Sequence, residues 1–270
     1  MKKTEVERIP IALPEEIANV CRGARLYDSS CSSDAKVYFI DRDGGFYLKT
    51  AKAGSLKREA EMTEYFCKLG LGGETISYIS GERDLLLTRA VVGEDCTTDI
   101  DLDDPRRLCD IVAQRLRALH ETTPKGCPVT DRVGEYLALA EKNYRSDSYD
   151  KSHFPDSFGY SSGEDAYRAL CEGKHLLKNE VLIHGDYCLP NIMLDGWRFS
   201  GFIDLGGAGV GDRHIDLFWG EWSMGFNLMI HGKIPENEAK KYGVRFLDAY
   251  GRDKIEKEKL RAVAAAEVFM

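Results

Sequence analysis

The sequence has no run of about 18 apolar residues, which is the length that a helix needs to cross a bilayer. It begins with Met1-Lys2-Lys3, whose two lysines are like the basic start of a signal peptide, but Glu5, Glu7 and two prolines interrupt the apolar stretch that such a peptide requires. We therefore expect a cytoplasmic protein that has no membrane partner.

Metal-binding and hydrolase motifs are also missing. The eight cysteines are scattered without a C-x-x-C pair, and the six histidines show neither H-x-x-x-H nor H-E-x-x-H spacing. The cysteines are therefore expected to be reduced thiols, and a zinc site is not predicted. The sequence has no G-x-S-x-G motif, so a serine hydrolase has no positive support.

Positive charge is in deficit. The chain has 37 Lys and Arg residues against 45 Asp and Glu residues, which gives a net charge of −8. Binding to nucleic acid or to an anionic membrane relies on an excess of positive charge. An acidic chain fits a small cationic partner better, and we expect it to act as a monomer or weak dimer.

The 270 residues have the composition of a globular protein, with 43% hydrophobic and 30% charged residues. This length suits one two-lobed unit or two small domains. The hydrophobic period changes from mostly strand-like to mostly helical near residues 88–93. The predicted class is α+β, with domains at 1–90 and 91–270.

The pattern of residues 1–90 predicts a β-hairpin followed by a helix. Residues 36–40 and 46–49 alternate as strands around a glycine-containing turn, and the alternation puts Tyr47 and Lys49 on one strand face. Helical spacing of apolar residues follows until Gly70. Two more strands are predicted at 75–80 and 85–88.

The second part predicts helices around a few short strands. A helix begins at Asp104-Pro105, where Asp caps the first turn. Residues 145–165 are rich in Ser, Asp, Tyr and Gly and predict a long loop. Short strands follow at 181–184, 192–194 and 198–204, and the chain is predicted to be helical from residue 216 onward.

The most specific segment is H-G-D-Y-C-L-P-N at 184–191, followed by I-D-L-G at 203–206. It holds an Asp and an Asn five residues apart, Asp186 and Asn191, and a second Asp, Asp204, after a short hairpin. Phosphoryl transfer uses one Asp beside the acceptor hydroxyl, and an Asn and another Asp as oxygen ligands to Mg²⁺. The spacing therefore predicts a kinase-type site.

These motifs resemble the aminoglycoside phosphotransferases, an antibiotic-resistance family within the protein-kinase-like superfamily. The segment D-R-H-I-D at 212–216 and the strands at 35–38 and 47–49 extend the resemblance over most of the chain. It implies a bilobal fold, with a β-rich N-terminal lobe containing one helix and a larger, mostly helical C-terminal lobe. It also implies ATP, with GTP as an alternative, and Mg²⁺ as cofactors.

The resemblance assigns roles in catalysis. It implies that Lys49 contacts the α- and β-phosphates, and that Glu59 holds Lys49 in place. It also implies that Asp186 is the catalytic residue and that Asn191 and Asp204 are the metal ligands.

The remaining nucleotide contacts also come from the resemblance. Tyr47 would stack on adenine, and backbone groups from Thr88 to Ala90 would bond to it. The loop at 29–33, ending at Ser33, would cover the phosphates.

The acceptor is predicted to be a polycation, since the resemblance implies phosphorylation of an aminoglycoside at its 3′-hydroxyl. Polycations need carboxylates around them. The acidic loop with Asp156, and Glu267 and Phe269 at the C-terminus, resemble the family's antibiotic-binding residues.

Four positions depart from the family pattern: Gly207, Trp222, Phe226 and Ala266. Tryptophan and phenylalanine would also suit a quaternary ammonium or a flatter ligand through cation–π contact. Two alternatives therefore stay open: a kinase of another amine-bearing metabolite, such as choline, homoserine or a sugar amine, and a non-catalytic nucleotide-binding module.

Overall fold

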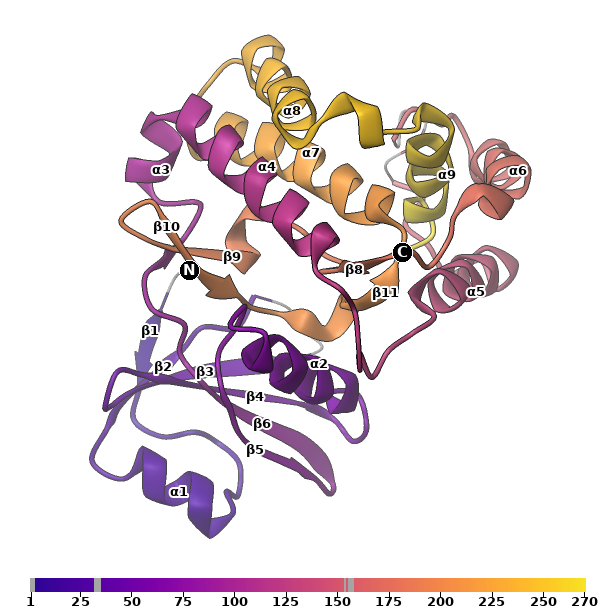
Figure 1. Ribbon diagram of the computed structural model, residues 1–270. Helices are drawn as coiled ribbons and strands as arrows, with labels where there is room; N and C mark the ends of the chain where they lie inside the picture. The colour runs from indigo at the N-terminus through magenta and orange to yellow at the C-terminus, as the bar shows by residue number, and fades with distance from the viewer. Residues whose placement is uncertain (1–2, 32–34, 153, 155–157) are drawn as a thin grey trace. The chain divides into compact units, whose positions relative to one another are not determined.

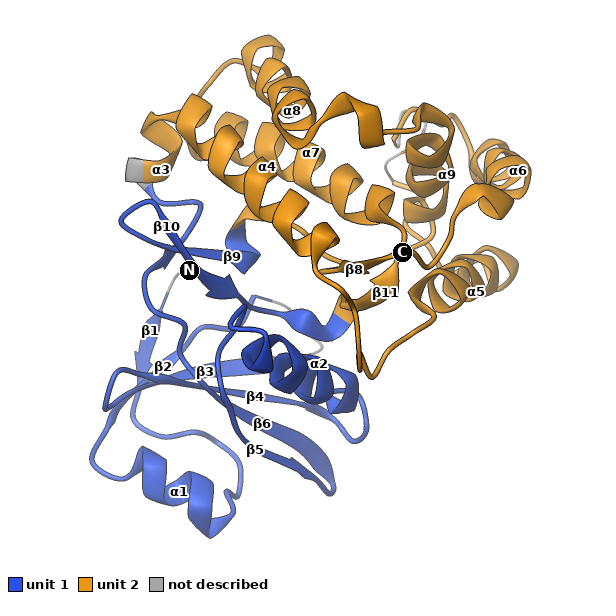
Figure 2. Ribbon diagram, in the orientation of Figure 1, with its two compact units in different colours: residues 1–98, 190–206 blue, residues 99–189, 207–270 orange. Residues whose placement is uncertain are grey.

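The structure is a computed structural model and describes residues 3–31, 35–152, 154 and 158–270. Its contacts divide the chain into two compact units, which Figure 2 shows in different colours. Unit 1 comprises residues 1–98 and 190–206, and unit 2 comprises residues 99–189 and 207–270. Strands and helices are mixed as the predicted α+β class requires. The domains at 1–90 and 91–270 stay a prediction.

Unit 1 is built on a six-stranded antiparallel sheet with the strand order β1-β2-β3-β4-β6-β5 (Figure 1). The strands are β1 (Thr4–Val6), β2 (Arg25–Asp28), β3 (Lys36–Asp41), β4 (Phe46–Lys52), β5 (Thr75–Ser80) and β6 (Arg83–Arg89). The predicted hairpin at 36–49 is confirmed, because Lys36 pairs with Thr50 and Ile40 pairs with Phe46.

One helix packs on each face of this sheet. Leu85 and Leu87 belong to the same apolar cluster as Ile17 of helix α1 (Glu15–Cys21), whereas Leu86 packs with Ala60 of helix α2 (Lys57–Lys68). Successive side chains of a strand point to opposite faces, so the run of three leucines supplies both clusters. Both faces of β6 are therefore buried.

A second, three-stranded sheet completes unit 1. It has the order β10-β9-β7 and comprises β7 (Glu94–Asp95), β9 (Ile192–Asp195) and β10 (Arg198–Phe202). Gly93 precedes β7 with a positive φ of 97°, and a Cβ there would collide with the Leu194 carbonyl. Only glycine allows this close approach.

Unit 2 is mostly helical (Figure 1). Its helices are α3 (Asp99–Asp103), α4 (Pro105–Glu121), α5 (Arg132–Arg145), α6 (Gly163–Gly173), α7 (Arg213–Ile230), α8 (Glu236–Tyr250) and α9 (Lys257–Glu267). Strands β8 (Val181–Ile183) and β11 (Gly209–Gly211) pair with each other. Short 3₁₀ helices lie at Lys174–Leu176 and Arg252–Lys254 in unit 2, at Leu189–Asn191, and at Leu205–Gly207.

Capping residues set where the helices begin. Asp104 accepts the N–H of Arg107 at 3.2 Å, which confirms the predicted start of α4. Asp212 rather than Asp216 caps α7, so this helix begins three residues earlier than the predicted start at 216. Ser162 caps α6, which begins at Gly163, so the last three residues of the predicted loop at 145–165 belong to this helix instead.

The sequence analysis predicted neither helix α1 nor the strands β1 and β7, which have three and two residues. Two or three residues are too few to show a period. Among the described helices, none combines the length and the apolar character needed to span a membrane.

Candidate nucleotide and catalytic sites

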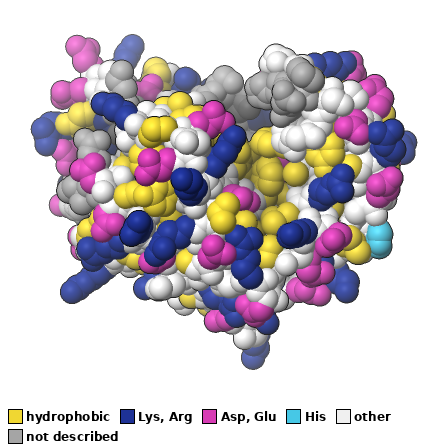
Figure 3. Space-filling view, turned by 90° about the horizontal axis from the view of Figure 1, so that it is seen from above, with side chains coloured by type: hydrophobic (Ala, Val, Ile, Leu, Met, Phe, Trp, Pro, Cys, Tyr) yellow, Lys and Arg dark blue, Asp and Glu magenta, His cyan; other side chains and the backbone are white. Residues whose placement is uncertain are grey.

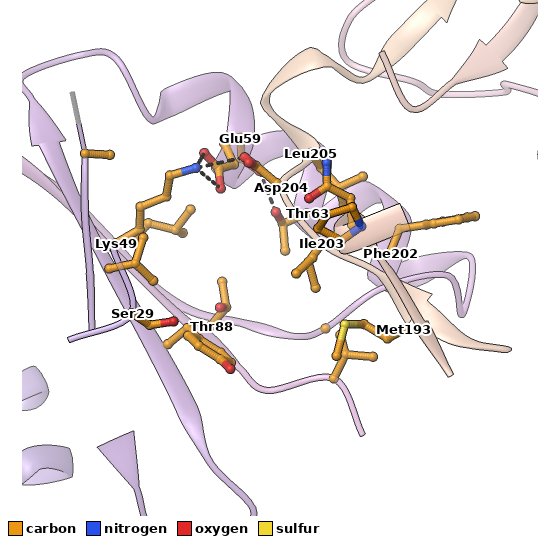
Figure 4. A pocket seen from close by; sticks show the side chains of 18 of the residues that line it. Ser29, Lys49, Glu59, Thr63, Thr88, Met193, Phe202, Ile203, Asp204 and Leu205 are labelled. Carbon is orange, nitrogen blue, oxygen red and sulfur yellow. Dashed lines mark hydrogen bonds and ion pairs between the residues drawn. The ribbon is translucent and has the colours of Figure 1, made fainter. Parts of the chain in front are cut away.

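Unit 1 contains a cavity of about 390 Å³, which strands β3, β4 and β6 and the β9–β10 hairpin line (Figure 4). Six of the predicted site residues line it: Tyr47, Lys49, Glu59, Thr88, Asn191 and Asp204. The cavity therefore brings together side chains that are up to 157 residues apart in the sequence, from Tyr47 to Asp204.

Lys49 is at the charged end of this cavity. Its Nζ lies 2.7 Å from Glu59 Oε2 and 2.8 Å from Asp204 Oδ1 (Figure 4). Burial by itself would lower the pKa of Lys49, but the two carboxylates outweigh it and raise this pKa. Burial raises the pKa of Glu59 against the opposing influence of Lys49. The lysine thus stays a cation at neutral pH, where it can attract an anionic group.

The strand register explains how Lys49 reaches the cavity. Lys49 pairs with Val37 on β3 and with Leu86 on β6, and these two partners also line the cavity. Glu59 lies in the first turn of α2 on the same buried face as Met62. A buried carboxylate there is tolerable because the Lys49 ammonium neutralises it.

Tyr47 lines the cavity two residues before Lys49 on the same face of β4. Burial raises its pKa to about 12, so the phenol is neutral. Its ring lies 5.1 Å from the Phe39 ring, centroid to centroid. The cavity therefore has an uncharged aromatic wall that could face a heterocycle.

Two other predicted nucleotide contacts, Ala90 and Ser33, are not among the described residues that line the cavity. Ala90 does not line the cavity, and its N–H donates to the Gly45 carbonyl at 3.0 Å. The N–H of Arg89 likewise donates to Glu74. A backbone contact to adenine from this segment stays a prediction. Ser33 lies outside the described residues, although Ser29 of the same loop lines the cavity.

The sequence prediction missed the apolar lining of the cavity, which includes Val37, Leu86, Met193 and Ile203. Val37 and Leu86 could have been found from the alternation of the strands, because both are cross-strand neighbours of Lys49. Met193 and Ile203 belong to the hairpin that carries the predicted metal ligands, and the hydrophobic period did not show which way they point.

The polar groups of the hairpin suit a hard cation. Asn191 and Asp204 both line the cavity and offer an amide and a carboxylate oxygen. Asp204 has a positive φ of 58°, which is uncommon for a non-glycine residue and is often found at functional sites. Across the described residues, no group of three or more His, Cys, Asp or Glu side chains could hold a metal. Mg²⁺ bound together with phosphates needs only one or two protein carboxylates, so these residues fit it.

The loop that carries Asp186 is anchored within unit 2. Asp216 of α7 is completely buried and accepts the N–H groups of His184 at 2.8 Å and Gly185 at 2.7 Å. His120 Nε2 lies 3.1 Å from the same carboxylate, and burial lowers the pKa of His120. These bonds from Asp216 anchor the loop to α7.

Glycine and histidine shape the turn before Asp186. Gly185 has a positive φ of 81°, and a Cβ there would collide with the Gly207 carbonyl. The N–H of Asp186 donates to His184 Nδ1 at 3.3 Å. His184 is fully buried, so its ring supports this turn from the interior of unit 2.

Glu267 lies at the end of α9 with 7% of its surface exposed. Its Oε1 accepts the Tyr136 hydroxyl at 2.7 Å and the Trp219 indole N–H at 3.0 Å. Burial raises the pKa of Glu267 to about 7, and the charge of Asp186 also contributes to the increase. A cation that reached Glu267 would therefore favour its ionised form.

Phe269, another predicted acceptor residue, is not displayed at a surface. Phe269 has no exposed surface and packs on Tyr144, Tyr149 and Tyr167. Its burial assigns it to the core of unit 2, and direct contact with a substrate stays a prediction. Asp156 lies outside the described residues.

Aromatic side chains follow one another along α7. The rings of Trp219 and Trp222 lie 5.5 Å apart, and Trp222 stacks on Phe226 at 4.7 Å with an interplanar angle of 12°. Trp222 is 40% exposed and Phe226 is 39% exposed. Figure 3 shows hydrophobic side chains gathered in a hollow on one face of the molecule, beside charged groups of both signs.

A mixed α+β fold, a buried lysine–glutamate pair and an anchored H-G-D loop are typical of a kinase-like phosphotransferase. The model of the phosphotransferase enzyme family matches residues 26–262. The chain belongs to this family and, within it, to the aminoglycoside phosphotransferases, so the predicted family and enzyme class are confirmed.

Individual relatives support this assignment. A probable aminoglycoside 3′-phosphotransferase from Lactococcus lactis is 46% identical over 257 residues, covering 95% of this chain and 94% of that protein. The crystal structure of a type VIII aminoglycoside 3′-phosphotransferase has a TM-score of 0.73 at 23% identity, over 92% of this chain and 94% of its own.

One similar structure contains ligands. An aminoglycoside phosphotransferase from Streptomyces rimosus, in complex with ADP and streptomycin, has a TM-score of 0.71 at 21% identity, covering 90% of this chain and 92% of its own. These structural likenesses confirm the predicted protein-kinase-like fold. The predicted cofactors of the family, ATP and Mg²⁺, are also confirmed.

Proposed function

We propose that this protein transfers the γ-phosphoryl group of ATP to the 3′-hydroxyl of an aminoglycoside. The observation that carries the kinase chemistry is the contact of Lys49 with both Glu59 and Asp204 in one cavity. The choice of acceptor and of its hydroxyl rests on the similarity to the Lactococcus lactis relative named for this activity.

The nucleotide would bind in the cavity of unit 1. Tyr47 and the apolar residues around it suit the adenine ring, and Lys49 suits the α- and β-phosphates because its ammonium donates to oxygen anions. Glu59 keeps Lys49 extended into the cavity. Asn191 and Asp204 would hold Mg²⁺, which neutralises phosphate charge when it is bound.

Asp186 would act on the acceptor. Its carboxylate orients the hydroxyl and takes its proton while the hydroxyl oxygen bonds to the γ-phosphorus and the bond to the ADP oxygen breaks. The backbone before Asp186 is fixed by Asp216, so the carboxylate is positioned before the substrate arrives. Positioning is the main contribution that proteins make to this reaction.

Carboxylates on the acceptor side would bind the amines of the drug. Glu267 is the predicted contact in the described part of unit 2, and ionisation gives it the charge that attracts an ammonium group. Asp156 belongs to the same proposal through its acidic loop. Phe269 would support Glu267 from within the core.

The partner in this proposal is a small cation, not nucleic acid or a membrane, and the chain acts as a monomer or weak dimer. The net charge of −8 supports the choice of ligand. A cytoplasmic location is also proposed, because all eight cysteines are free thiols, as is usual in a reducing compartment.

Release of ADP in the presence of Mg²⁺ tests the proposal directly. Kanamycin, neomycin and amikacin should each stimulate it, and NMR of the product should show phosphate at the 3′ position. Asp186→Asn should lower kcat by roughly 10²–10⁴ while ATP still binds. Asp195→Asn, an exposed aspartate at the end of β9, should leave kcat unchanged. No stimulation by any aminoglycoside would contradict the assignment of the acceptor.

The aromatic residues of α7 favour a second candidate acceptor. Stacked and partly exposed Trp222 and Phe226 would suit a quaternary ammonium, which binds to ring faces. Choline and homoserine therefore belong in the same assay. Stimulation by choline alone would support this candidate, whereas nucleotide binding without transfer to any acceptor would indicate a non-catalytic module.

A further inference from the structure

A short loop joins the strand that carries Lys49 to the helix that carries Glu59. Strand β4 ends at Lys52 and α2 follows Leu56, so this loop determines where the first turn of the helix starts. Leucine has no polar side-chain atom and cannot cap the helix itself. The N–H of Leu56 is one of the groups at a helix start that the helix leaves unsatisfied, so its acceptor must come from another element.

Asp84 on β6 supplies this acceptor. Its Oδ2 accepts the N–H of Leu56 at 2.8 Å, and its Oδ1 accepts the N–H of Gly54 at 2.8 Å. Asp84 is completely buried. It pairs with Ala51 on β4 and with Ser80 on β5, so strands on both sides hold its backbone. One carboxylate, fixed within the sheet, thus binds two backbone groups of the loop.

Two hydroxyl groups complete the bonding of this carboxylate. Ser80 donates to Asp84 Oδ1 at 2.6 Å, and Tyr78 donates to Asp84 Oδ2 at 3.0 Å. Burial acts to raise the pKa of Asp84, but the hydrogen bonds outweigh burial and lower this pKa. The carboxylate is therefore ionised at neutral pH, and hydrogen bonds to an ionised acceptor are stronger than those between neutral groups.

The bond to Leu56 reaches Glu59 through the backbone of α2. The Leu56 carbonyl accepts the N–H of Ala60 at 2.9 Å, so the residue that Asp84 holds is also the first acceptor of the helix. Glu59 lies within this first turn, with its Oε1 3.0 Å and its Oε2 2.7 Å from Lys49 Nζ (Figure 4). A shift of the helix start would therefore move the Glu59 carboxylate relative to Lys49.

Apolar packing also holds α2, but less strictly. Leu56 and Ala60 pack with Leu86 of β6 in one cluster, which keeps the helix on the sheet. Apolar contacts are non-directional, so they resist a small slide of the helix only weakly, whereas hydrogen bonds depend on both distance and angle. The bonds to Asp84 therefore define the position of the helix start.

We propose that Asp84 is a positioning residue for the nucleotide site, which fixes the start of α2 and so places the Glu59 carboxylate against Lys49. It does this by binding the N–H groups of Gly54 and Leu56. The proposal rests on the phosphate-binding role proposed above for Lys49. Asp84 is not among the described residues that line the cavity, so it acts through Glu59 and not by touching the nucleotide.

Steady-state kinetics with ATP and kanamycin, well below the unfolding temperature of each variant, test the proposal. Asp84→Asn keeps the size of the side chain, but its NH₂ group cannot accept, so one of the two backbone bonds is lost. We expect kcat/KM for ATP to fall roughly fivefold, which is typical for the loss of one hydrogen bond, with KM for kanamycin unchanged. Asp41→Asn, a partly exposed aspartate at the end of β3, should change neither value.

A double variant distinguishes positioning from a purely structural role. When Glu59→Gln is already present, Lys49 no longer depends on the Glu59 side chain. Asp84→Asn should then lower kcat/KM for ATP by less than about 1.5-fold, since residues that act through one another are not additive. A residue that only stabilises the fold would cause the same loss in both backgrounds. Such an additive loss, or no loss in Asp84→Asn alone, would overturn the proposal.

If Asp84→Asn does not fold, Gly54→Ala gives the second measurement. Gly54 has a positive φ of 81°, and among the described residues no atom lies within 4 Å of an added Cβ. Alanine therefore strains the turn without a collision, and kcat/KM for ATP should fall about twofold. A loss that disappears in the Glu59→Gln background supports the proposal. No loss, or an equal loss in both backgrounds, contradicts it.

Lys49→Met separates this proposal from the one on which it rests. If Lys49→Met loses activity with ATP while Asp84→Asn behaves as the wild type, only the positioning role of Asp84 fails. If Lys49→Met keeps the kcat/KM of the wild type for ATP, the role of Lys49 fails and the proposal for Asp84 fails with it.

Discussion

Glu59 in unit 1 and Glu267 in unit 2 are equally well buried, at 9% and 7% exposed, but their partners differ. Glu59 faces the ammonium of Lys49 at 2.7 Å. Glu267 faces two neutral donors, the Tyr136 hydroxyl and the Trp219 indole. Burial raises the pKa of both carboxyl groups, but only Glu59 has a cation close by to oppose the increase.

The difference in partners gives two buried carboxylates different uses. Glu59 is already paired, so its charge serves to hold Lys49 and the net charge of the pair is zero. Glu267 has hydrogen bonds but no counterion, so a cationic ligand could supply the missing charge. One glutamate is thus suited to support an anion-binding lysine, and the other to bind a cation directly.

Removing the cation from the paired site should have the largest effect. Lys49→Met leaves the Glu59 and Asp204 carboxylates facing the cavity without the ammonium, and they would repel phosphate. We expect kcat/KM for ATP to fall roughly 10²–10³-fold, as for other electrostatic contacts to transferring groups. Lys52→Met, the exposed lysine at the end of the same strand, is the matched control. A loss of less than tenfold would contradict the phosphate contact.

Neutralising Glu59 should have a smaller effect. Glu59→Gln keeps an oxygen for Lys49 but removes the charge, so Lys49 should turn toward Asp204. We expect kcat/KM for ATP to fall about tenfold, which corresponds to about 1.4 kcal/mol. Glu61→Gln, on the exposed face of the same helix, should behave as the wild type. An equal loss in both variants would mean that the pair does not position Lys49.

Stability should respond to pH at the unpaired glutamate. The pKa of Glu267 is about 7 in the folded protein, against 4.5 for an ordinary glutamate. The stability that its neutral form contributes is therefore complete below pH 4.5 and is lost as the pH rises through 7. Gln cannot ionise and can still accept both hydrogen bonds. The free energy of unfolding of Glu267→Gln, relative to that of the wild type, should therefore increase by about 2 kcal/mol from pH 5 to pH 8. Urea unfolding at the two pH values measures it.

The control for this measurement is Glu258→Gln, an exposed glutamate in the first turn of α9. Its unfolding free energy should differ from that of the wild type by the same small amount at both pH values. If the difference in unfolding free energy between Glu267→Gln and the wild type is also the same at both pH values, the carboxyl group of Glu267 is not neutral in the folded protein. The contrast with Glu59 then disappears.

The smallest effect is expected at the exposed aromatic residues. Trp222→Ala removes a ring face that stacks on Phe226, and an exposed cation–π contact contributes about 0.5–1 kcal/mol. KM for a cationic acceptor should rise roughly two- to fivefold, with KM for ATP unchanged. Ile230→Ala, an exposed aliphatic residue at the end of the same helix, should change neither value. A rise in KM for ATP instead would contradict a role on the acceptor side.

The sequence predicted the paired site better than the unpaired one. Tyr47 and Lys49 were correctly placed on one strand face, because a period of two determines where side chains point. The segments around Asp186 and Asp204 were found by their spacing alone. Glu267 was found through the family resemblance, but its partners were not, since Tyr136 and Trp219 come from two other helices.

Long-range packing explains what the sequence did not show. Phe269 was predicted to meet a substrate, yet three tyrosines from elsewhere in unit 2 enclose it. The bond from the Leu189 N–H to Ser223 of α7 joins residues 34 positions apart, and no local period marks such a contact. Helix starts were shifted by capping residues, as Asp212 shows for α7.

Unit 1 is assembled from two separate stretches of chain, since residues 190–206 complete what residues 1–98 begin. On the ribosome, the strand β7 must wait for its partner β9 until residues 99–189 have been synthesised. At about 5–20 residues per second this interval lasts roughly 5–20 seconds. During that time the nascent chain has Lys49 and Glu59 but lacks Asn191 and Asp204, so it cannot yet build the complete cavity.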